Sequence, residues 1–284
     1  MPEINWYPGH MAKTRRLLAE QLKAVDAVVE LCDARAPQAT RNPDLNYLCR
    51  GKTRILILNK ADLADDAVTS QWLAHYRDMG LNPIRFNSTG TRTRDVLSAI
   101  EAACAPAVER MRARGVNKTA RLMVIGIPNV GKSTFINKVA HRKTARAEDR
   151  PGVTRTKQWV PVDQTLELLD TPGILWPKFD DKNVGLRLAF TGAIKDDVMD
   201  IEELACALMA YLAAHYADIV TQRYKITIED GDSGYDLLIK AGRKRGFLMR
   251  GAEVDTERMA RILLDEFRGG KLGTFTLETV EDAQ

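Results

Sequence analysis

The sequence has few cysteines, no long hydrophobic run and no repeated or low-complexity segment. Its four cysteines are far apart and form no CxxC pair, which argues against a disulfide framework or a thiolate metal cluster and favours reduced core residues. The longest apolar run, Leu204 to Ala214, has about half of the ~20 residues that a membrane-spanning helix needs. The first residues also lack the apolar stretch of a secretory signal. We therefore expect a cytoplasmic protein with no membrane partner.

The overall composition is typical of a folded globular protein. Hydrophobic residues make up 45% of the chain and charged residues 28%, a balance that argues against disorder. The net charge of +4 permits an acidic partner such as nucleic acid but does not require one. The length of 284 residues exceeds one average domain and predicts a core domain with a smaller second one.

The first part of the chain alternates between strand and helix patterns. Helical patterns cover residues 68–79 and 94–103, between short apolar runs that end in polar, loop-forming residues. Such runs are typical of buried parallel strands, and the alternation predicts a doubly wound α/β sheet. The predicted strands cover residues 27–31, 55–58, 122–125 and 166–169.

From about residue 180 the patterns are helical only. Helices are expected over residues 201–219 and 232–245, and a further helix after Asp255, a plausible N-cap. The sequence therefore predicts an α/β domain over residues 1–179 and a smaller all-helical domain over residues 180–284.

A glycine-rich segment, GIPNVGKS, follows the third predicted strand and precedes a helical pattern. It fits the phosphate-binding pattern GxxxxGKS in the strand-loop-helix context that this pattern requires. Its backbone N–H groups and the following helix N-terminus would face phosphates, Lys132 would neutralise the β- and γ-phosphates, and Ser133 would ligate Mg²⁺. The nucleotide-binding residues predicted here are Asn129, Val130, Gly131, Lys132, Ser133 and Thr134.

Two further loops complete the predicted phosphate site. The segment DTPG follows the fourth predicted strand, where Asp170 would hold Mg²⁺, through a water molecule, and the Gly173 N–H would lie near the γ-phosphate. Between the two motifs, the segment PGVT contains Thr154, which could close on Mg²⁺ and the γ-phosphate. The alternative for Thr154 is an ordinary turn residue.

The segment NKAD, from Asn59 to Asp62, ends the second predicted strand. The Asp62 carboxylate could accept hydrogen bonds from both N1–H and the exocyclic amine of guanine, a pair that adenine lacks. Asn59, Lys60 and Ala61 would shape the loop, with the Lys60 stem covering the base. Residues Asn87 and Ser88 could offer a backbone N–H to the guanine O6, or could form an ordinary turn.

The order of these motifs is unusual, because in an ordinary GTPase the phosphate loop comes first and NKxD last. Here the guanine motif precedes the phosphate loop, so the domain is circularly permuted. With this order, WYPGHM from Trp6 to Met11 and DARAP from Asp33 to Pro37, the chain resembles the bacterial ribosome biogenesis GTPase A (YlqF/RbgA) family. The resemblance implies a factor for late assembly of the large ribosomal subunit, whose GTP hydrolysis is stimulated by a pre-50S particle containing rRNA.

The residue after DTPG is Ile174, which cannot hydrogen-bond the attacking water, as the glutamine of many GTPases does. The resemblance assigns this role to His10, whose imidazole suits a residue that orients or deprotonates water. His10 could instead anchor its segment or contact rRNA. In related GTPases an asparagine at the position of Asn129 helps to bind K⁺, which would add positive charge between the phosphates; the alternative is a loop-stabilising amide.

The segment KAGRKRGFLMR is basic and contains no acidic residue. It is the best candidate for RNA contact, although such charges often belong to solvated helix faces. The candidates are Lys240, Arg243, Lys244, Arg245 and Arg250. We expect a monomer away from the ribosome. The competing interpretations are a GTP-dependent switch or binding module for another protein or structured RNA, and, disfavoured by Asp62, an ATPase.

Overall fold

The computed structural model describes Arg16 and residues 18–113, 115, 119–141, 158–171, 173 and 181–283. The chain folds into two compact units. The larger unit extends to Arg187 and also contains Phe275–Gln284, whereas the helical unit contains Leu188–Thr274. This division differs from the boundary expected at residue 180, because helix α6 (Lys182–Phe190) begins in the larger unit and the chain later returns to that unit.

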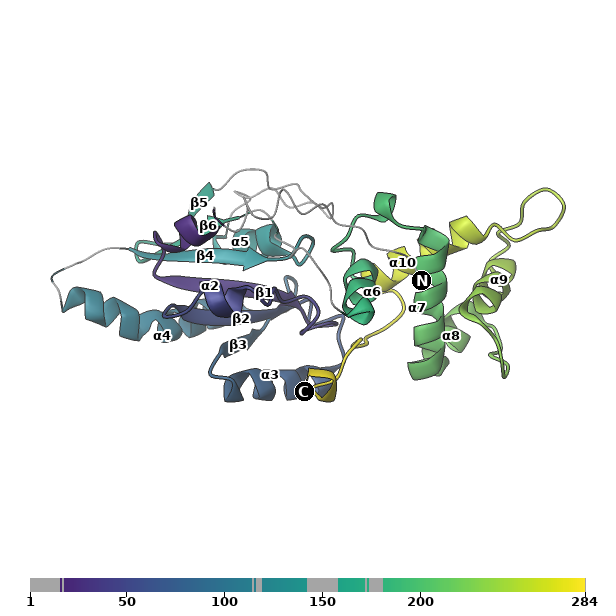
Figure 1. Cartoon of the computed structure of the whole chain (residues 1–284), viewed down its shortest axis with the longest axis horizontal. Helices are drawn as coiled ribbons and strands as arrows, with labels where there is room; N and C mark the ends of the chain where they lie inside the picture. The colour runs from purple at the N-terminus through teal and green to yellow at the C-terminus, as the bar shows by residue number, and fades with distance from the viewer. Residues whose placement is uncertain are drawn as a thin grey trace. The chain divides into compact units, whose positions relative to one another are not determined.

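Six strands form one sheet in the larger unit, in the order β3-β2-β1-β4-β6-β5 (Figure 1). All neighbouring strands are parallel except β5, which runs antiparallel to β6. The four predicted strands are confirmed, while β3 and the antiparallel β5 were not predicted. The strands are β1 Ala27–Asp33, β2 Thr53–Asn59, β3 Asn82–Arg85, β4 Ala120–Gly126, β5 Gln158–Pro161 and β6 Leu166–Asp170.

The order of the strands reverses between β1 and β4, and this places the helices. Because crossovers between parallel strands are right-handed, α2 (Leu45–Leu48) and α3 (Asp66–Asp78) lie on one face, and α4 (Thr93–Arg112) and α5 (Lys132–Val139) on the other. In agreement, α4 packs against α5. The sheet is therefore doubly wound, as predicted. Its reversal point, between the carboxyl ends of β1 and β4, is where such sheets bind ligands.

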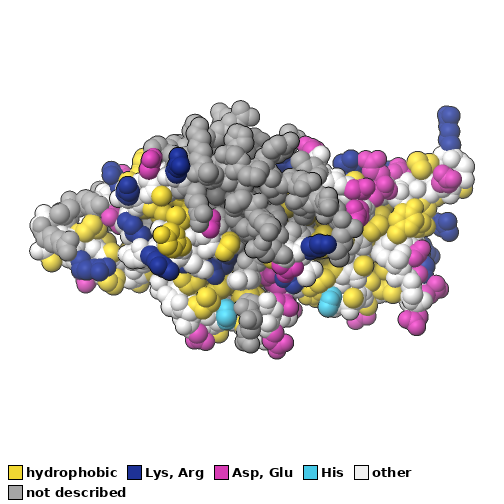
Figure 2. Space-filling view, viewed as in Figure 1, with side chains coloured by type: hydrophobic (Ala, Val, Ile, Leu, Met, Phe, Trp, Pro, Cys, Tyr) yellow, Lys and Arg dark blue, Asp and Glu magenta, His cyan; other side chains and the backbone are white. Residues whose placement is uncertain are grey.

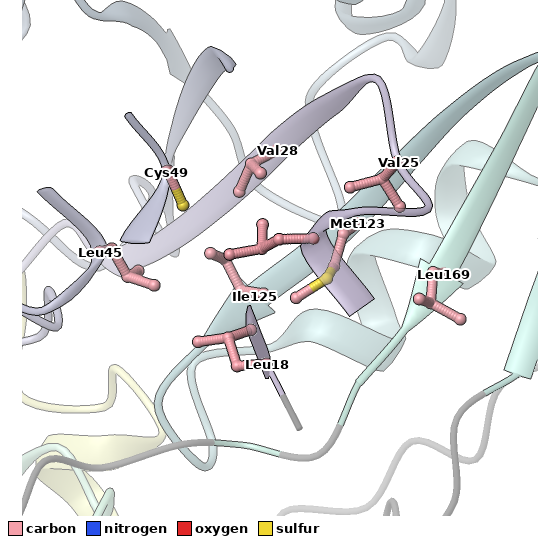
Figure 3. Close-up of a cluster of buried hydrophobic side chains, with 9 residues drawn as sticks. Leu18, Val25, Val28, Leu45, Cys49, Met123, Ile125 and Leu169 are labelled. Carbon is pink, nitrogen blue, oxygen red and sulfur yellow. The ribbon is translucent and has the colours of Figure 1, made fainter. Parts of the chain in front are cut away.

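Two buried clusters lie on the face of the sheet that carries α2 and α3, and all seven residues of β1 are buried, so this strand is covered on both faces. In Figure 3, Val28 of β1 and Met123 and Ile125 of β4 gather with Leu18 and Leu45 in one buried cluster. A second cluster packs Trp72 and Tyr76 of α3 against apolar side chains of β2. Strands that are buried on both faces read as continuous apolar runs, which is why their positions could be predicted.

The helical unit is built around α7 (Ile201–His215), which packs against α8 (Ala217–Tyr224), α9 (Gly234–Lys244) and α10 (Thr256–Arg268). A short 3-10 turn, Asp196–Val198, precedes α7. Side chains cap three of the helices, and one of them is the predicted N-cap Asp255, which accepts from the Arg258 N–H. The predicted helix over residues 201–219 is wrong in one respect: it breaks at Tyr216, whose backbone angles are not helical.

No single helix among the described residues is both long and apolar enough to cross a membrane. Helices α7 and α8 meet the length and composition of a span only when they are taken together, and they are bent by 115° at the break between them. Five apolar side chains of α7 are buried, and α7 packs against α9 and α10.

Candidate functional site

The predicted guanine-reading loop, residues 59–62, follows β2 and is joined directly to the phosphate loop, residues 126–133. Buried Asn59 donates from Nδ2 to the Val130 carbonyl at 2.7 Å, and Lys60 donates from Nζ to the Asn129 carbonyl at 2.9 Å. These two bonds join segments about 70 residues apart in the chain. Asp62 is exposed, so its carboxylate is available to an incoming base. The structure thus brings together the two motifs whose order is reversed in the sequence.

The phosphate loop has glycine where no other residue fits. At Gly126 a Cβ would lie 2.7 Å from the Leu31 carbonyl oxygen of β1. Gly131 has a φ of 94°, in the left-handed region, and a Cβ there would overlap the Asn59 amide. Helix α5 begins immediately afterwards at Lys132. The N–H groups at the start of a helix that follows such a loop are the groups that bind phosphate.

The DTPG loop approaches the phosphate loop closely. A Cβ on Gly173 would lie 2.6 Å from the Pro128 backbone nitrogen, so only glycine permits this approach. The Thr171 hydroxyl donates to the Val124 carbonyl of β4 at 2.7 Å and fixes the start of the loop. The N–H predicted to sense the γ-phosphate is therefore held against the loop that would bind the phosphates.

Oxygen ligands suitable for Mg²⁺ meet between these two loops. The Ser133 hydroxyl lies 3.3 Å from Asp170 Oδ2, and the other carboxylate oxygen of Asp170 is buried without a hydrogen-bond partner among the described residues. A buried polar atom without a partner is costly, and a hydroxyl beside a carboxylate is the oxygen donor set that Mg²⁺ accepts alongside phosphate and water. These residues therefore fit the ion. No group of three or more His, Cys, Asp or Glu side chains among the described residues could hold a metal ion by itself.

Lys132 is buried and folds back over its own loop. Its Nζ donates to the Ile127 carbonyl at 2.8 Å. Burial lowers the pKa of Lys132 to about 8, although the nearby charge of Asp170 opposes that shift. Burial likewise raises the pKa of Asp170, against the opposing effects of Lys132 and the Ser133 hydroxyl. Both shifts disfavour the charged forms, and the anionic phosphates and the cation that this site would take would stabilise those forms.

The loop after β3 lies beside the guanine-reading loop, because the Ala61 N–H donates to the Phe86 carbonyl at 3.1 Å. The Asn87 side chain accepts from the N–H groups of Gly90 and Thr91, and its own N–H donates to the Thr91 hydroxyl at 2.9 Å. Asn87 therefore shapes the turn. The remaining candidate donor to a guanine O6 is the N–H of Ser88, which is exposed.

Two residues of DARAP support the site, a role that the sequence analysis did not predict. Asp33 Oδ2 lies 2.8 Å from Arg35 Nη2 and 3.2 Å from Lys60 Nζ, and both Asp33 and Arg35 are buried. Burial alone would raise the pKa of Asp33, but Arg35 and Lys60 outweigh it and hold that pKa below its usual range. Asp33 is thus an anion that holds the Lys60 side chain. The sequence feature that could have indicated this role is the pair of charged residues, Asp33 and Arg35, at the end of a buried strand.

The predicted catalytic residue His10, the predicted Mg²⁺ ligand Thr154, and Ile174, which follows DTPG, lie outside the described residues. Their roles stay predictions from the sequence.

The five RNA-contact candidates differ in their surroundings. Lys240 pairs with Glu229 and Asp232 at 2.9 and 2.7 Å, and Arg245 pairs with the buried Glu266 at 3.0 Å. Acids distant in sequence thus engage two of the five, and on the visible face in Figure 2 basic and acidic side chains are interspersed. The exposed candidates are Arg243, Lys244 and Arg250.

A guanine motif, a phosphate loop and a DTPG loop that meet at the reversal point of one sheet define a circularly permuted P-loop GTPase. The family model described as a 50S ribosome-binding GTPase matches residues 121–227. Ribosome biogenesis GTPase A of Priestia megaterium is 45% identical over 284 residues, which cover 99% of this chain and 98% of that protein. The chain belongs to the ribosome biogenesis GTPase A family.

Solved structures agree with this assignment. The GDP-bound YlqF of Thermotoga maritima has a TM-score of 0.66 and 27% identity, and the match covers 94% of this chain and all of that one. The GNP-bound form of that protein gives a TM-score of 0.65 and 26% identity, with the same coverage. The permuted order of the motifs is therefore a property of the fold that this chain shares.

Proposed function

We propose that the protein binds GTP at the carboxyl ends of β1, β2, β4 and β6 and hydrolyses it as a late assembly factor of the large ribosomal subunit. The observation that carries the nucleotide site is the pair of hydrogen bonds from Asn59 and Lys60 to the phosphate loop. They hold a base-reading loop and a phosphate-binding loop in one continuous surface. Membership of the ribosome biogenesis GTPase A family supports the ribosomal role.

In this site Asp62 reads the base and the phosphate loop binds the phosphates. The N–H groups at the start of α5 and the Lys132 ammonium donate hydrogen bonds to the phosphate oxygens. Lys132 must first break its hydrogen bond to the Ile127 carbonyl. Ser133 and Asp170, the latter through a water molecule, would hold Mg²⁺, which neutralises charge on the β- and γ-phosphates when bound. The Gly173 N–H, which lies beside Pro128, would donate a hydrogen bond to the γ-phosphate and so distinguish GTP from GDP.

The attacking water needs a residue that orients it, and Ile174 cannot do so. We assign this role to His10, which accepts a proton from the water or holds it by a hydrogen bond. Thr154 closes on the metal side of the phosphates. Stimulation by a ribosomal particle would act through the segments that carry these two residues.

Asn129 is the proposed K⁺ ligand, and its backbone suggests a selective test. Its φ of 57° lies in the left-handed region, which glycine also adopts, and its carbonyl receives Lys60. The substitution Asn129→Gly therefore removes the amide while keeping the loop. We expect hydrolysis by the unaltered protein to be about tenfold faster in KCl than in NaCl, and this ratio to approach one in the variant. Equal ratios in the two proteins, measured by phosphate release, would exclude this role.

The ribosomal role is tested by co-sedimentation with large subunits. The protein should pellet with them in a non-hydrolysable GTP analogue and be released in GDP, and the subunits should accelerate its hydrolysis. A switch for another protein or structured RNA would give no subunit binding in either state. Tight binding without any stimulation of hydrolysis would contradict the proposed enzyme and leave a binding module.

We propose that Arg243, Lys244 and Arg250 contact rRNA, because each is exposed and none forms an ion pair with an acid among the described residues. Replacing all three by Ala should weaken binding to large subunits and reduce the slope of log affinity against log salt by about 2 to 3. The matched control replaces three other exposed basic residues of the same unit, Lys225, Arg261 and Lys271. An equal loss of subunit affinity in the two variants would show that only the net charge of the protein matters.

A further inference from the structure

The segment Phe275–Val280 crosses back from the helical unit to the larger unit and lies on the loops that follow β1 and β2. The Phe275 N–H donates to the Leu63 carbonyl at 3.2 Å, and the Leu277 N–H donates to the Arg35 carbonyl at 2.6 Å. Phe275 and Leu277 are buried. We call this segment the strap.

The strap reaches the guanine-reading loop directly. Leu63, whose carbonyl it holds, is the residue after Asp62. Two residues further along, the Asp65 N–H donates to the Thr276 hydroxyl at 3.2 Å. Asp65 also caps α3 by accepting from the Val68 N–H at 2.9 Å. The strap and the helix cap therefore fix the carboxyl side of the loop that carries Asp62.

Glu278 anchors the strap from inside the protein. Its buried carboxylate accepts from the N–H groups of Gln38 and Ala39, and it pairs with Arg187 of α6 at 3.1 Å. Its backbone carbonyl accepts from Trp72 Nε1 at 3.2 Å. Burial raises the pKa of Glu278 to about 7, against the opposing effects of Arg187 and the two N–H groups. A carboxyl that is this desolvated is retained because it satisfies buried donors.

A second route leads from the strap to the base through charged side chains. The Arg35 carbonyl receives Leu277, and the Arg35 guanidinium holds Asp33 by two bonds, at 2.9 and 2.8 Å. Asp33 in turn lies 3.2 Å from Lys60 Nζ. Lys60 needs such support because its φ of 58° is in the left-handed region, which is unfavourable for a lysine.

We propose that the strap positions the guanine-reading loop, so that Thr276, Leu277 and Glu278 are positioning residues for base specificity. This inference rests on the proposed binding of guanine nucleotide. Removing the Glu278 carboxylate leaves the part-buried Gln38 N–H and the buried Ala39 N–H without their acceptor. It also loosens the segment that orients Asp33 and Lys60. Affinity for the base should fall more than affinity for the phosphates, because the bonds of the strap reach the phosphate loop only indirectly, through Lys60 and the Asn129 carbonyl.

The test compares Glu278→Ala with Asp282→Ala, which removes a more exposed carboxylate that pairs with the same Arg187. Two quantities are measured for each variant: the affinities for GDP and IDP, and the melting temperature. IDP lacks the exocyclic amine that Asp62 would read. We expect Glu278→Ala to lose about tenfold in GDP affinity and clearly less in IDP affinity. Glu278→Gln, which keeps an acceptor oxygen, should restore most of the GDP preference, and Asp282→Ala should match the unaltered protein.

An unchanged ratio of GDP to IDP affinity in Glu278→Ala, with only a lower melting temperature, would overturn the proposal and leave the strap a structural element. If Glu278→Ala does not fold, Thr276→Val removes a single acceptor at the same loop and is judged by the same ratio. The unaltered protein provides the separate check on the proposed function, because it should prefer GDP to ADP. Equal affinity of the unaltered protein for GDP and ADP would refute the proposed guanine specificity itself.

Discussion

The substitution Asp62→Asn should change the base specificity of the protein from guanine to xanthine. Guanine offers two donors, N1–H and the exocyclic amine, to the Asp62 carboxylate, whereas an Asn amide faces that amine with its own N–H. The unmatched donors should lower GTP affinity by about 100-fold or more. Xanthine has a carbonyl oxygen where guanine has the amine, so the variant should bind XTP better than GTP. Competition between fluorescent GDP and each nucleotide measures both changes.

The neighbouring carboxylate of Asp65 supplies the control for this experiment. Asp65 caps α3, and asparagine caps helices as well as aspartate does, so Asp65→Asn should keep the preference for GTP. If Asp62→Asn bound GTP and ATP as the unaltered protein does, the base would be read elsewhere. That outcome would revive the ATPase interpretation.

The substitution His10→Ala should remove most hydrolysis while leaving GTP affinity unchanged. A residue that orients or deprotonates the attacking water acts in the transition state and contributes about 10² to 10⁴-fold in rate. Single-turnover hydrolysis on large subunits, together with the Kd for GTP, separates the two effects. Unchanged turnover of His10→Ala on the particle would refute this assignment.

Two further variants define how His10 acts. In His10→Gln the amide can still orient water but cannot take its proton, so recovery of much of the rate would indicate orientation rather than base catalysis. A base would also make the rate fall at pH values below the ordinary histidine pKa of about 6.5. His215→Ala, which changes an exposed histidine of the helical unit, should leave the rate unaltered.

The strands, the loops and the permuted order could be predicted because each depends on residues close together in the sequence. A buried strand is a continuous apolar run, and the phosphate loop is one octapeptide whose glycines have local reasons, such as the φ of 94° at Gly131. The strand β5 was missed because it has four residues and pairs antiparallel at the edge of the sheet.

Contacts between distant residues could not be predicted. Nothing near Lys240 or Arg245 in the basic segment reveals that Asp232 and Glu266 pair with them in the folded unit. The helix break at Tyr216 is a change of backbone angles. The apolar pattern continues past this residue, so the sequence does not reveal the break. Glu278 lies 240 residues from Gln38, whose N–H it accepts, so its sequence neighbours give no indication of its role.

The strap also determines when the protein becomes competent during its own synthesis. The guanine-reading loop leaves the ribosome about 200 residues before the segment that holds it, since the strap contacts Asp65 from Thr276. At the usual elongation rate of about 5 to 20 residues per second, the loop waits for ten seconds or more on that estimate. During this interval the nascent sheet would hold guanine nucleotide weakly, and tight binding would begin only once the helical unit had been translated.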